Sequence, residues 1–219
     1  GYFSAYNSAD QQNWGIGISD EIHLYANGGI TIYGGFANIE TALFIENSAG
    51  GYNDLAISNP LSAKGDVTLV SPQLRLYTYG YYVRSTQGDL YLRTNSFNYF
   101  TNSSLRATVG TVNISSYSPG ALTAPNAALV SAPRLVYGDA GDTTVLTVGA
   151  MTAAQTANIT TEIVFQASNG VQFNGIFESE NAVVALSPDS DGDLSGAVTF
   201  ADGAGITSGG DLTLDFFFF

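Results

Sequence analysis

Short stretches of alternating apolar and polar residues recur along the chain. The clearest lie at residues 22–25, 30–33, 67–70, 74–77 and 90–93. β-branched and aromatic residues at every second position are typical of a strand with one buried face. Glycine, asparagine, serine, aspartate and proline separate these stretches, as turns require. The pattern predicts an all-β protein with one short helix at residues 151–158, where alanine and glutamine gather.

A repeat with a period of about 23 residues is the most informative feature. Gly-Asp-Val-Thr-Leu at residues 65–69 matches Gly-Asp-Leu-Tyr-Leu at 88–92, and residues 74–77 match 97–100 at the same offset. The period holds three short strands, none of which can bury its apolar face alone. Stacking successive coils about 4.8 Å apart would pair their backbones and close a core. Gly-Asp at the start of a coil supplies a permissive backbone and a side chain that can bond nearby amides.

Two kinds of stacked coil fit this repeat. One is a single-chain β-solenoid of triangular section, and the other is a trimeric β-helix in which three chains wrap together. We align the third strand of the period as residues 82–84 with residues 105–107, and Gly-Asp-Leu-Thr-Leu at 210–214 repeats the unit. The alternative is β-sandwiches throughout the chain, because short strands at spacings of about 8–12 residues also describe them.

Changes in composition predict four segments. The strands after residue 138 are longer and better formed, and we expect them to build a small antiparallel β-sandwich-like domain. The segment before them is rich in alanine, proline and serine, which suits a linker. The segments are an N-terminal extension (1–18), a repetitive β-helix or solenoid-like region (19–116), a linker (117–137) and a C-terminal β domain with a docking tail (138–219).

The charge is unevenly distributed along the chain, whose net charge is −13. Residues 1–63 and 135–219 carry acidic but no basic side chains, whereas residues 64–134 carry all six basic ones. This basic segment predicts a partner surface, or head-to-tail complementarity between subunits. Arg75, Arg84 and Arg93 are evenly spaced in it, which suggests stacked positions at a subunit interface. A net negative chain repels phosphate backbones, so we expect no nucleic-acid partner.

Membrane and cysteine chemistry find no support in the sequence. No apolar run reaches the roughly 18 residues of a membrane span, so we expect no membrane insertion. The chain has no cysteine, which rules out disulfides and cysteine-ligated zinc.

No group of residues in the sequence predicts catalysis. His23 is the only histidine and alternates with Ile22 and Leu24, so it should point to the solvated face of a strand. No Gly-x-Ser-x-Gly motif accompanies it. Glu178 and Glu180 share one side of a strand, and we interpret them as a solvated edge. We therefore assign no catalytic residue and expect no enzymatic activity.

Asp189, Asp191 and Asp193 form the sharpest local cluster. Carboxylates at alternate positions around Gly192 can converge on one hard cation, as in calcium loops with an Asp-x-Asp-x-Asp core. Leu194 departs from the helix-loop-helix version, which needs glycine there. The cluster predicts either a structural calcium site or an acidic surface turn, and we expect no other cofactor.

The chain ends in four consecutive phenylalanines that need burial, because exposed they would promote aggregation. We expect this tail to dock into a neighbouring subunit or a trimer axis, with docking on its own domain as the alternative. The residues are Phe216, Phe217, Phe218 and Phe219.

The Gly-Asp-Leu-x-Leu units, low lysine content and alanine-, threonine-, glycine- and asparagine-rich filler resemble tail-fibre and spike proteins of tailed bacteriophages. The resemblance covers residues 19–116 and, weakly, 203–215, and filamentous adhesins use similar units. It implies intertwined homotrimeric stalks and a structural, adhesive role in a virion. Its implied partners are other copies of the chain, further virion subunits and a host-surface glycan.

Two rival functions stay open. One is a secreted or cell-surface filament or adhesin subunit joined by strand exchange. The other, less favoured, is a polysaccharide-degrading β-helix enzyme. The resemblance and the first rival both place the protein in a virion, or outside or on the surface of a cell.

Overall fold

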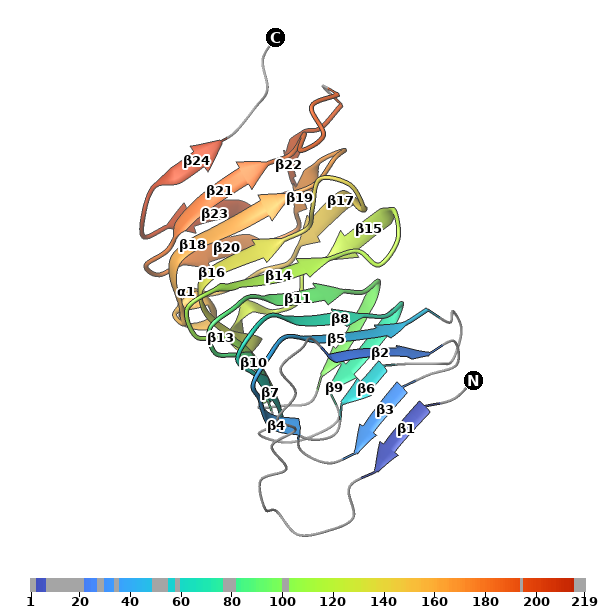
Figure 1. Cartoon of the computed structure of the whole chain (residues 1–219). Helices are drawn as coiled ribbons and strands as arrows, with labels where there is room; N and C mark the ends of the chain where they lie inside the picture. The colour runs from blue at the N-terminus through green and yellow to red at the C-terminus, as the bar shows by residue number, and fades with distance from the viewer. Residues whose placement is uncertain are drawn as a thin grey trace. The chain divides into compact units, whose positions relative to one another are not determined.

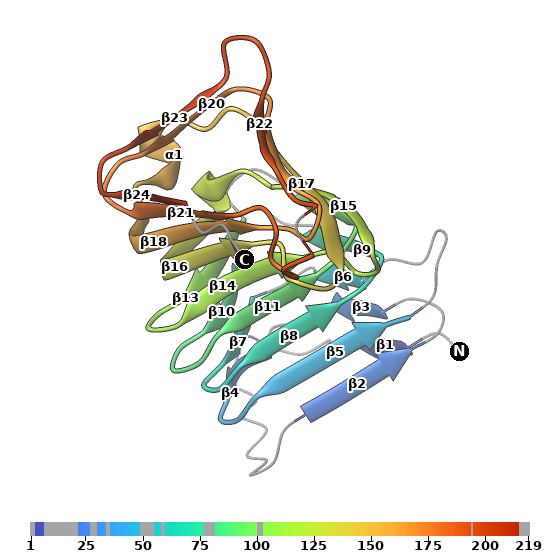
Figure 2. The ribbon, with the colours of Figure 1, turned by 90° about the horizontal axis from the view of Figure 1, so that it is seen from above.

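The computed structural model describes residues 3–6, 22–26, 30–33, 36–48, 55–57, 60–76, 82–99, 103–193 and 195–214. The chain divides into two compact units, residues 1–110 and 111–219. Each unit is a β-solenoid, in which the chain winds through successive coils and each strand pairs in parallel with its counterpart in the next coil (Figures 1 and 2). The all-β, solenoid-like fold expected from the repeat is confirmed.

In the first unit, strands that follow one another in the chain go to different sheets. The parallel sheets run in the orders β1-β3-β6-β9-β12, β2-β5-β8-β11 and β4-β7-β10-β13. The strands are β1 (Phe3–Tyr6), β2 (Ile22–Ala26), β3 (Ile30–Tyr33), β4 (Phe36–Ile39), β5 (Leu43–Asn47), β6 (Leu55–Ile57), β7 (Leu61–Ala63), β8 (Val67–Val70), β9 (Gln73–Leu76), β10 (Tyr82–Ser85), β11 (Leu90–Arg93), β12 (Ser96–Tyr99) and β13 (Ser104–Ala107).

The strand register confirms most of the repeat and corrects one part of it. Leu90 of β11 pairs with Val67 of β8, at the predicted offset. In the third strand of the coil, however, Arg84 pairs with Arg106, whereas the sequence alignment set it against Ala107. The connection before β13 is one residue shorter than the connection before β10. A slip of one residue changes which side chains share a face of the sheet.

The core of the first unit consists of aliphatic side chains that stack from coil to coil. Leu61, Val83 and Leu105 are aligned in adjacent strands and are all at most 1% exposed. Polar side chains are buried where strands end, and they bond to the next coil or to their own turn. Asn47 donates to Ser71 (Nδ2–Oγ 3.4 Å), and Ser71 donates to the Gln73 carbonyl (2.8 Å). These bonds satisfy the polar groups inside the coil.

The Gly-Asp corners hold adjacent coils together. The Asp89 amide donates to the Asp66 carboxylate of the preceding coil (N–Oδ1 2.8 Å). A Cβ on Gly88 would lie 2.7 Å from the Asp66 backbone nitrogen. Neither Gly65 nor Gly88 has a positive φ. The amide bond predicted for the aspartate is present, but glycine is required there for close approach between coils rather than for an unusual backbone conformation.

The second unit also pairs its strands in parallel, in the orders β14-β16-β18-β21-β24, β15-β17-β19-β22 and β20-β23. Its elements are β14 (Thr111–Ser115), β15 (Gly120–Thr123), η1 (Ala127–Leu129), β16 (Val130–Tyr137), β17 (Thr143–Val148), α1 (Ala153–Thr156), β18 (Ile159–Gln166), β19 (Val171–Phe173), β20 (Ile176–Ser179), β21 (Val183–Ser187), β22 (Val198–Phe200), β23 (Gly205–Ser208) and β24 (Leu212–Leu214). The short helix expected at 151–158 is confirmed as α1.

Two expectations for this region are wrong. Residues 138–219 do not form an antiparallel sandwich, since β18 pairs in parallel with both β16 and β21. Residues 117–137 are not a linker, because β15 and β16 within them pair with β17 and β18. The alternative of β-sandwiches throughout the chain is also wrong, because the described strands pair in parallel. Alternation of apolar and polar residues is the same in a solenoid strand and a sandwich strand, so it does not reveal strand direction.

The core of the second unit contains an aromatic cluster. Phe165 lies edge-on to Phe177 with ring centroids 5.0 Å apart, and it stacks on Tyr137 at 5.5 Å. These three rings and Phe173 are fully buried. The Tyr137 hydroxyl donates to the Pro125 carbonyl (2.6 Å), so its polar end is satisfied inside the core.

One chain closes every described coil by itself. Strand pairing is between segments roughly one coil apart in the same chain, such as Glu162 of β18 with Val183 of β21. The described strands therefore form a single-chain solenoid and not the intertwined three-chain helix that the phage resemblance implies. No helix in the described part of the chain is both long and apolar enough to cross a membrane.

Candidate functional site

The evenly spaced arginines of the basic segment do not stack on one another. Arg75 lies in β9, Arg84 in β10 and Arg93 in β11, and none of these three strands pairs with another of them. A spacing of this size corresponds to one strand and its turn, and it carries the chain to the next side of the coil. Stacked arginines must instead be one coil apart. Their role in a subunit interface stays a prediction.

Arg84 and Arg106 do form a stacked pair. They are register partners on β10 and β13. Arg84 donates to Ser62 (Nε–Oγ 3.2 Å) and Arg106 donates to Ser104 (Nε–Oγ 2.9 Å). Both guanidinium carbons lie over the Tyr82 ring, at 5.2 and 5.3 Å from its centroid. The repeat predicted from the sequence did not show this pair, because it matched residues 82–84 with 105–107, one residue out of the observed register.

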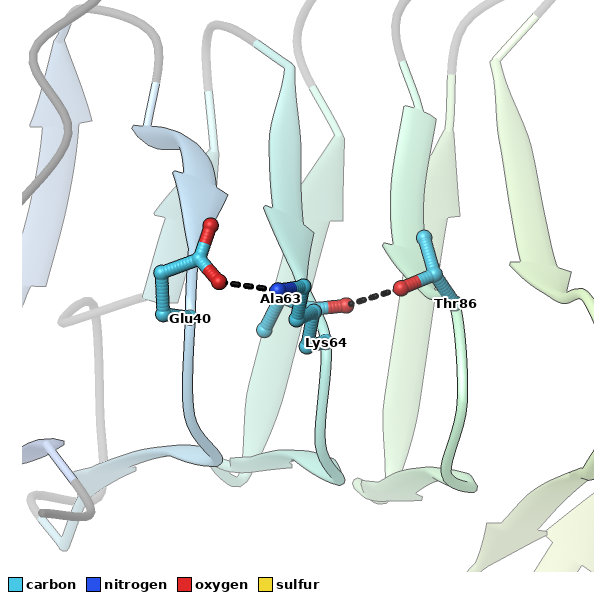
Figure 3. A network of polar contacts seen from close by, with 4 residues as sticks. All are labelled: Glu40, Ala63, Lys64 and Thr86. Carbon is cyan, nitrogen blue, oxygen red and sulfur yellow. Dashed lines mark hydrogen bonds and ion pairs between the residues drawn. The ribbon is translucent and has the colours of Figure 1, made fainter. Parts of the chain in front are cut away.

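Two other basic residues are neutralised by acids on neighbouring coils. Lys64 forms an ion pair with Glu40 of the preceding coil, while the carbonyl of Ala63 accepts from the Thr86 hydroxyl of the next (Figure 3). Arg134 pairs with Glu162, and both of these side chains are partly exposed. Within the described residues no such carboxylate contacts Arg84 or Arg106.

The three aspartates singled out in the sequence do converge. One carboxylate oxygen from each of Asp189, Asp191 and Asp193 lies within 4.8 Å of the others. Asp189 is buried and the other two are exposed, and Gly192 between them has a φ of 75°. Three carboxylates at this separation can ligate one hard cation. Calcium binding there stays a prediction.

Hydrogen bonds keep one of these aspartates ionised. Ser195 donates its backbone amide to Asp193 (N–Oδ1 2.9 Å). Hydrogen bonding by Ser195 lowers the pKa of the Asp193 carboxyl below its ordinary value. The Asp193 carboxyl is therefore negatively charged at neutral pH.

The side chain of Tyr91 is hydrogen-bonded to the aspartate of a Gly-Asp corner. Tyr91 projects from β11 and donates to Asp89 (Oη–Oδ2 2.9 Å). Burial of the phenol, followed by this hydrogen bond and the nearby carboxylate charges, raises the pKa of Tyr91 to about 12. Nothing in the sequence pattern indicated this interaction.

His23 and Glu178 contact other parts of the fold. His23 is exposed, as expected, and contacts Tyr25 (Nδ1–Oη 3.0 Å) and the Phe44 ring (centroids 5.4 Å apart). The Glu178 carboxylate accepts from the Ala153 amide at the start of α1 (3.1 Å), so it holds this helix in place.

The last described coil exposes apolar side chains that are buried in earlier coils. Leu212 is 49% exposed, although its register partner Val184 is fully buried. Leu214 is 51% exposed against 1% for its partner Leu186. The tail that was expected to dock, Phe216, Phe217, Phe218 and Phe219, lies outside the described residues.

A scan against protein-family models, a search of curated proteins and a search of solved structures found no match to this chain.

Proposed function

We propose that the protein is a structural subunit of an extracellular or virion assembly that serves in surface attachment. The apolar side chains exposed on the last described coil of the second unit carry this proposal. In a solenoid each coil is covered by its neighbours, and the free edge of a terminal strand is ready to pair with a further strand. The exposed Leu212 and Leu214 continue buried columns of side chains and offer such an edge for assembly.

Other side chains on the same coil support this reading. Phe200 of β22 is 50% exposed, while its partner Phe173 is fully buried and stacks on it at a centroid distance of 5.3 Å. Apolar residues at the end of two of the sheets would be covered together by one further coil. We propose that a second copy of the chain supplies that coil by parallel strand addition.

The two leading assemblies differ in symmetry. A phage tail fibre or spike would close around a threefold axis, whereas a secreted or cell-surface filament would extend as an open helical array. Coils closed by one chain, together with an uncovered coil end, favour end-to-end stacking and hence the filament. The tail fibre rests on the resemblance of the Gly-Asp-Leu units.

Substitution at the exposed coil end tests the proposal. Leu212→Asp with Leu214→Asp should abolish assembly, measured as mass by analytical ultracentrifugation and as symmetry by electron microscopy. Thr213→Asp is the matched control, because Thr213 alternates with both leucines and pairs with the partly exposed Ala185. A wild-type chain that stays monomeric at high concentration, or a double variant that assembles like wild type, would overturn the proposal.

A further inference from the structure

We propose that Arg84, Arg106 and Tyr82 form a binding site for an oxyanion carried on an acidic saccharide, either a carboxylate or a sulfate ester. The site lies on the outer face of the sheet formed by β7, β10 and β13. This inference deepens the attachment role proposed above and rests on it for the biological source of the saccharide.

Arg84 and Arg106 place two like charges side by side on neighbouring strands. Like charges directly opposite each other in a sheet destabilise it. The chain has only six basic residues and 19 acidic ones, yet two of the six occupy register-matched positions. Lys64 and Arg134 show how this fold neutralises a base with an acid one coil away. A bound anion would neutralise both Arg84 and Arg106 at once.

The two guanidinium groups are held in position by the protein itself. Each Nε is occupied by a serine hydroxyl, Ser62 for Arg84 and Ser104 for Arg106. The terminal nitrogens of each guanidinium are separate donors that these bonds do not use. Neighbouring strands hold the two side chains about 4.8 Å apart at the backbone, so two guanidinium groups can share the oxygens of one anion. Arg106 is exposed and Arg84 half-buried, which leaves the pair accessible.

The side chains around the arginine pair favour an anion that is carried on a sugar. The Tyr82 ring lies against both guanidinium groups, and the partly exposed Ser104 hydroxyl lies beside Arg106; an aromatic ring and a hydroxyl at the anion site suit a sugar better than a bare ion. A nucleic acid would need many phosphate contacts along its backbone, more than one pair of arginines supplies. A short acidic saccharide needs only this local pair.

Binding measurements on the full chain test the site. Isothermal titration calorimetry measures binding of four probes. Galacturonate is a single acidic sugar and polygalacturonate its polymer. Inorganic sulfate is an anion without a sugar, and dextran is a sugar polymer without charge. We expect both galacturonate probes to bind and dextran not to bind. Arg84→Gln and Arg106→Gln should each weaken binding about tenfold or more, as expected for loss of a charge-assisted hydrogen bond.

Arg134→Gln is the matched control, because it removes the same charge from an arginine that already has a carboxylate partner. Arg106→Lys keeps the charge at an exposed position, so it should fold normally and still lose affinity through loss of the planar guanidinium. Circular dichroism checks the fold of each variant.

Three results would overturn the inference. The first is that no galacturonate probe binds the wild-type chain, and the second is that Arg134→Gln weakens binding as much as Arg84→Gln. The third is that the arginine substitutions abolish self-association without affecting saccharide binding, which would assign the pair to a second copy of the chain. Assembly is measured by mass and saccharide binding by titration, so failure of one proposal is distinguishable from failure of the other.

Discussion

Replacing Gly88 with alanine tests whether the Gly-Asp unit exists to bring coils close together. A Cβ at this position would lie 2.2 Å from Asp66 Oδ1, 2.7 Å from the Asp66 nitrogen and 2.8 Å from the Gly65 carbonyl carbon. Two of these atoms belong to the backbone, so a side-chain rotation alone cannot relieve the clash. The two coils must separate locally, which would also stretch the hydrogen bond from the Asp89 amide to Asp66.

The expected loss of stability is the sum of three contributions, two that destabilise the protein and one that stabilises it. Overpacking a tight site costs about 1–3 kcal/mol, and weakening the hydrogen bond costs about 1 kcal/mol. Alanine restricts the unfolded chain and returns up to about 1 kcal/mol. The net loss is about 2 kcal/mol, which lowers the midpoint of urea unfolding by about 1 M for a denaturant slope of about 2 kcal/mol per molar.

Urea unfolding followed by circular dichroism measures this loss. Gly141→Ala is the control, because a Cβ there meets no atom within 4 Å and the residue has no positive φ. We expect that variant to be as stable as wild type, or more stable by up to about 1 kcal/mol. If Gly88→Ala unfolds at the wild-type urea concentration, close stacking of the corner is not why glycine stands there.

Three further predictions concern other parts of the structure. Tyr91 should ionise near pH 12 in an absorbance titration, because its pKa is raised to about 12. Its contribution to stability is therefore complete below the ordinary phenol pKa near 10 and is lost as the pH rises through about 12. Tyr91→Phe should remove the absorbance change near pH 12, and persistence of that change in the variant would refute the assignment. Phe165→Ala should cost about 3–5 kcal/mol of unfolding free energy, because the ring is fully buried among other aromatic rings; a loss below about 1 kcal/mol in thermal or urea unfolding would contradict the packing. The Asp193 carboxyl should titrate in NMR with a pKa below the ordinary aspartate range, so the stability it contributes is present above the unfolded pKa and lost as the pH falls through the lowered one. Ser195→Pro removes both the side-chain hydroxyl and the backbone amide that bond to Asp193, so it should bring the pKa back toward that range; an unchanged titration would refute the role of Ser195.

The repeat made much of the first unit predictable. Residues such as Val67 and Leu90 alternate with polar ones and recur at a fixed distance, so their pairing between β8 and β11 follows from the sequence alone. The convergence of Asp189, Asp191 and Asp193 was also predictable, because alternate residues around a glycine lie close together in a turn. The first follows from a fixed repeat in the sequence, and the second from the local geometry of a turn.

Long-range arrangement was not predictable in the same way. Whether β18 pairs in parallel or antiparallel depends on where the chain returns, and alternating residues look the same in both cases. The position of Arg84 opposite Arg106, and not Ala107, depends on one residue in a connection. The sequence by itself determined that this protein is made of short strands in repeated coils. Only the tertiary structure decided that one chain closes each coil and in which register the third strand of the coil pairs, because backbone pairing between distant segments sets both.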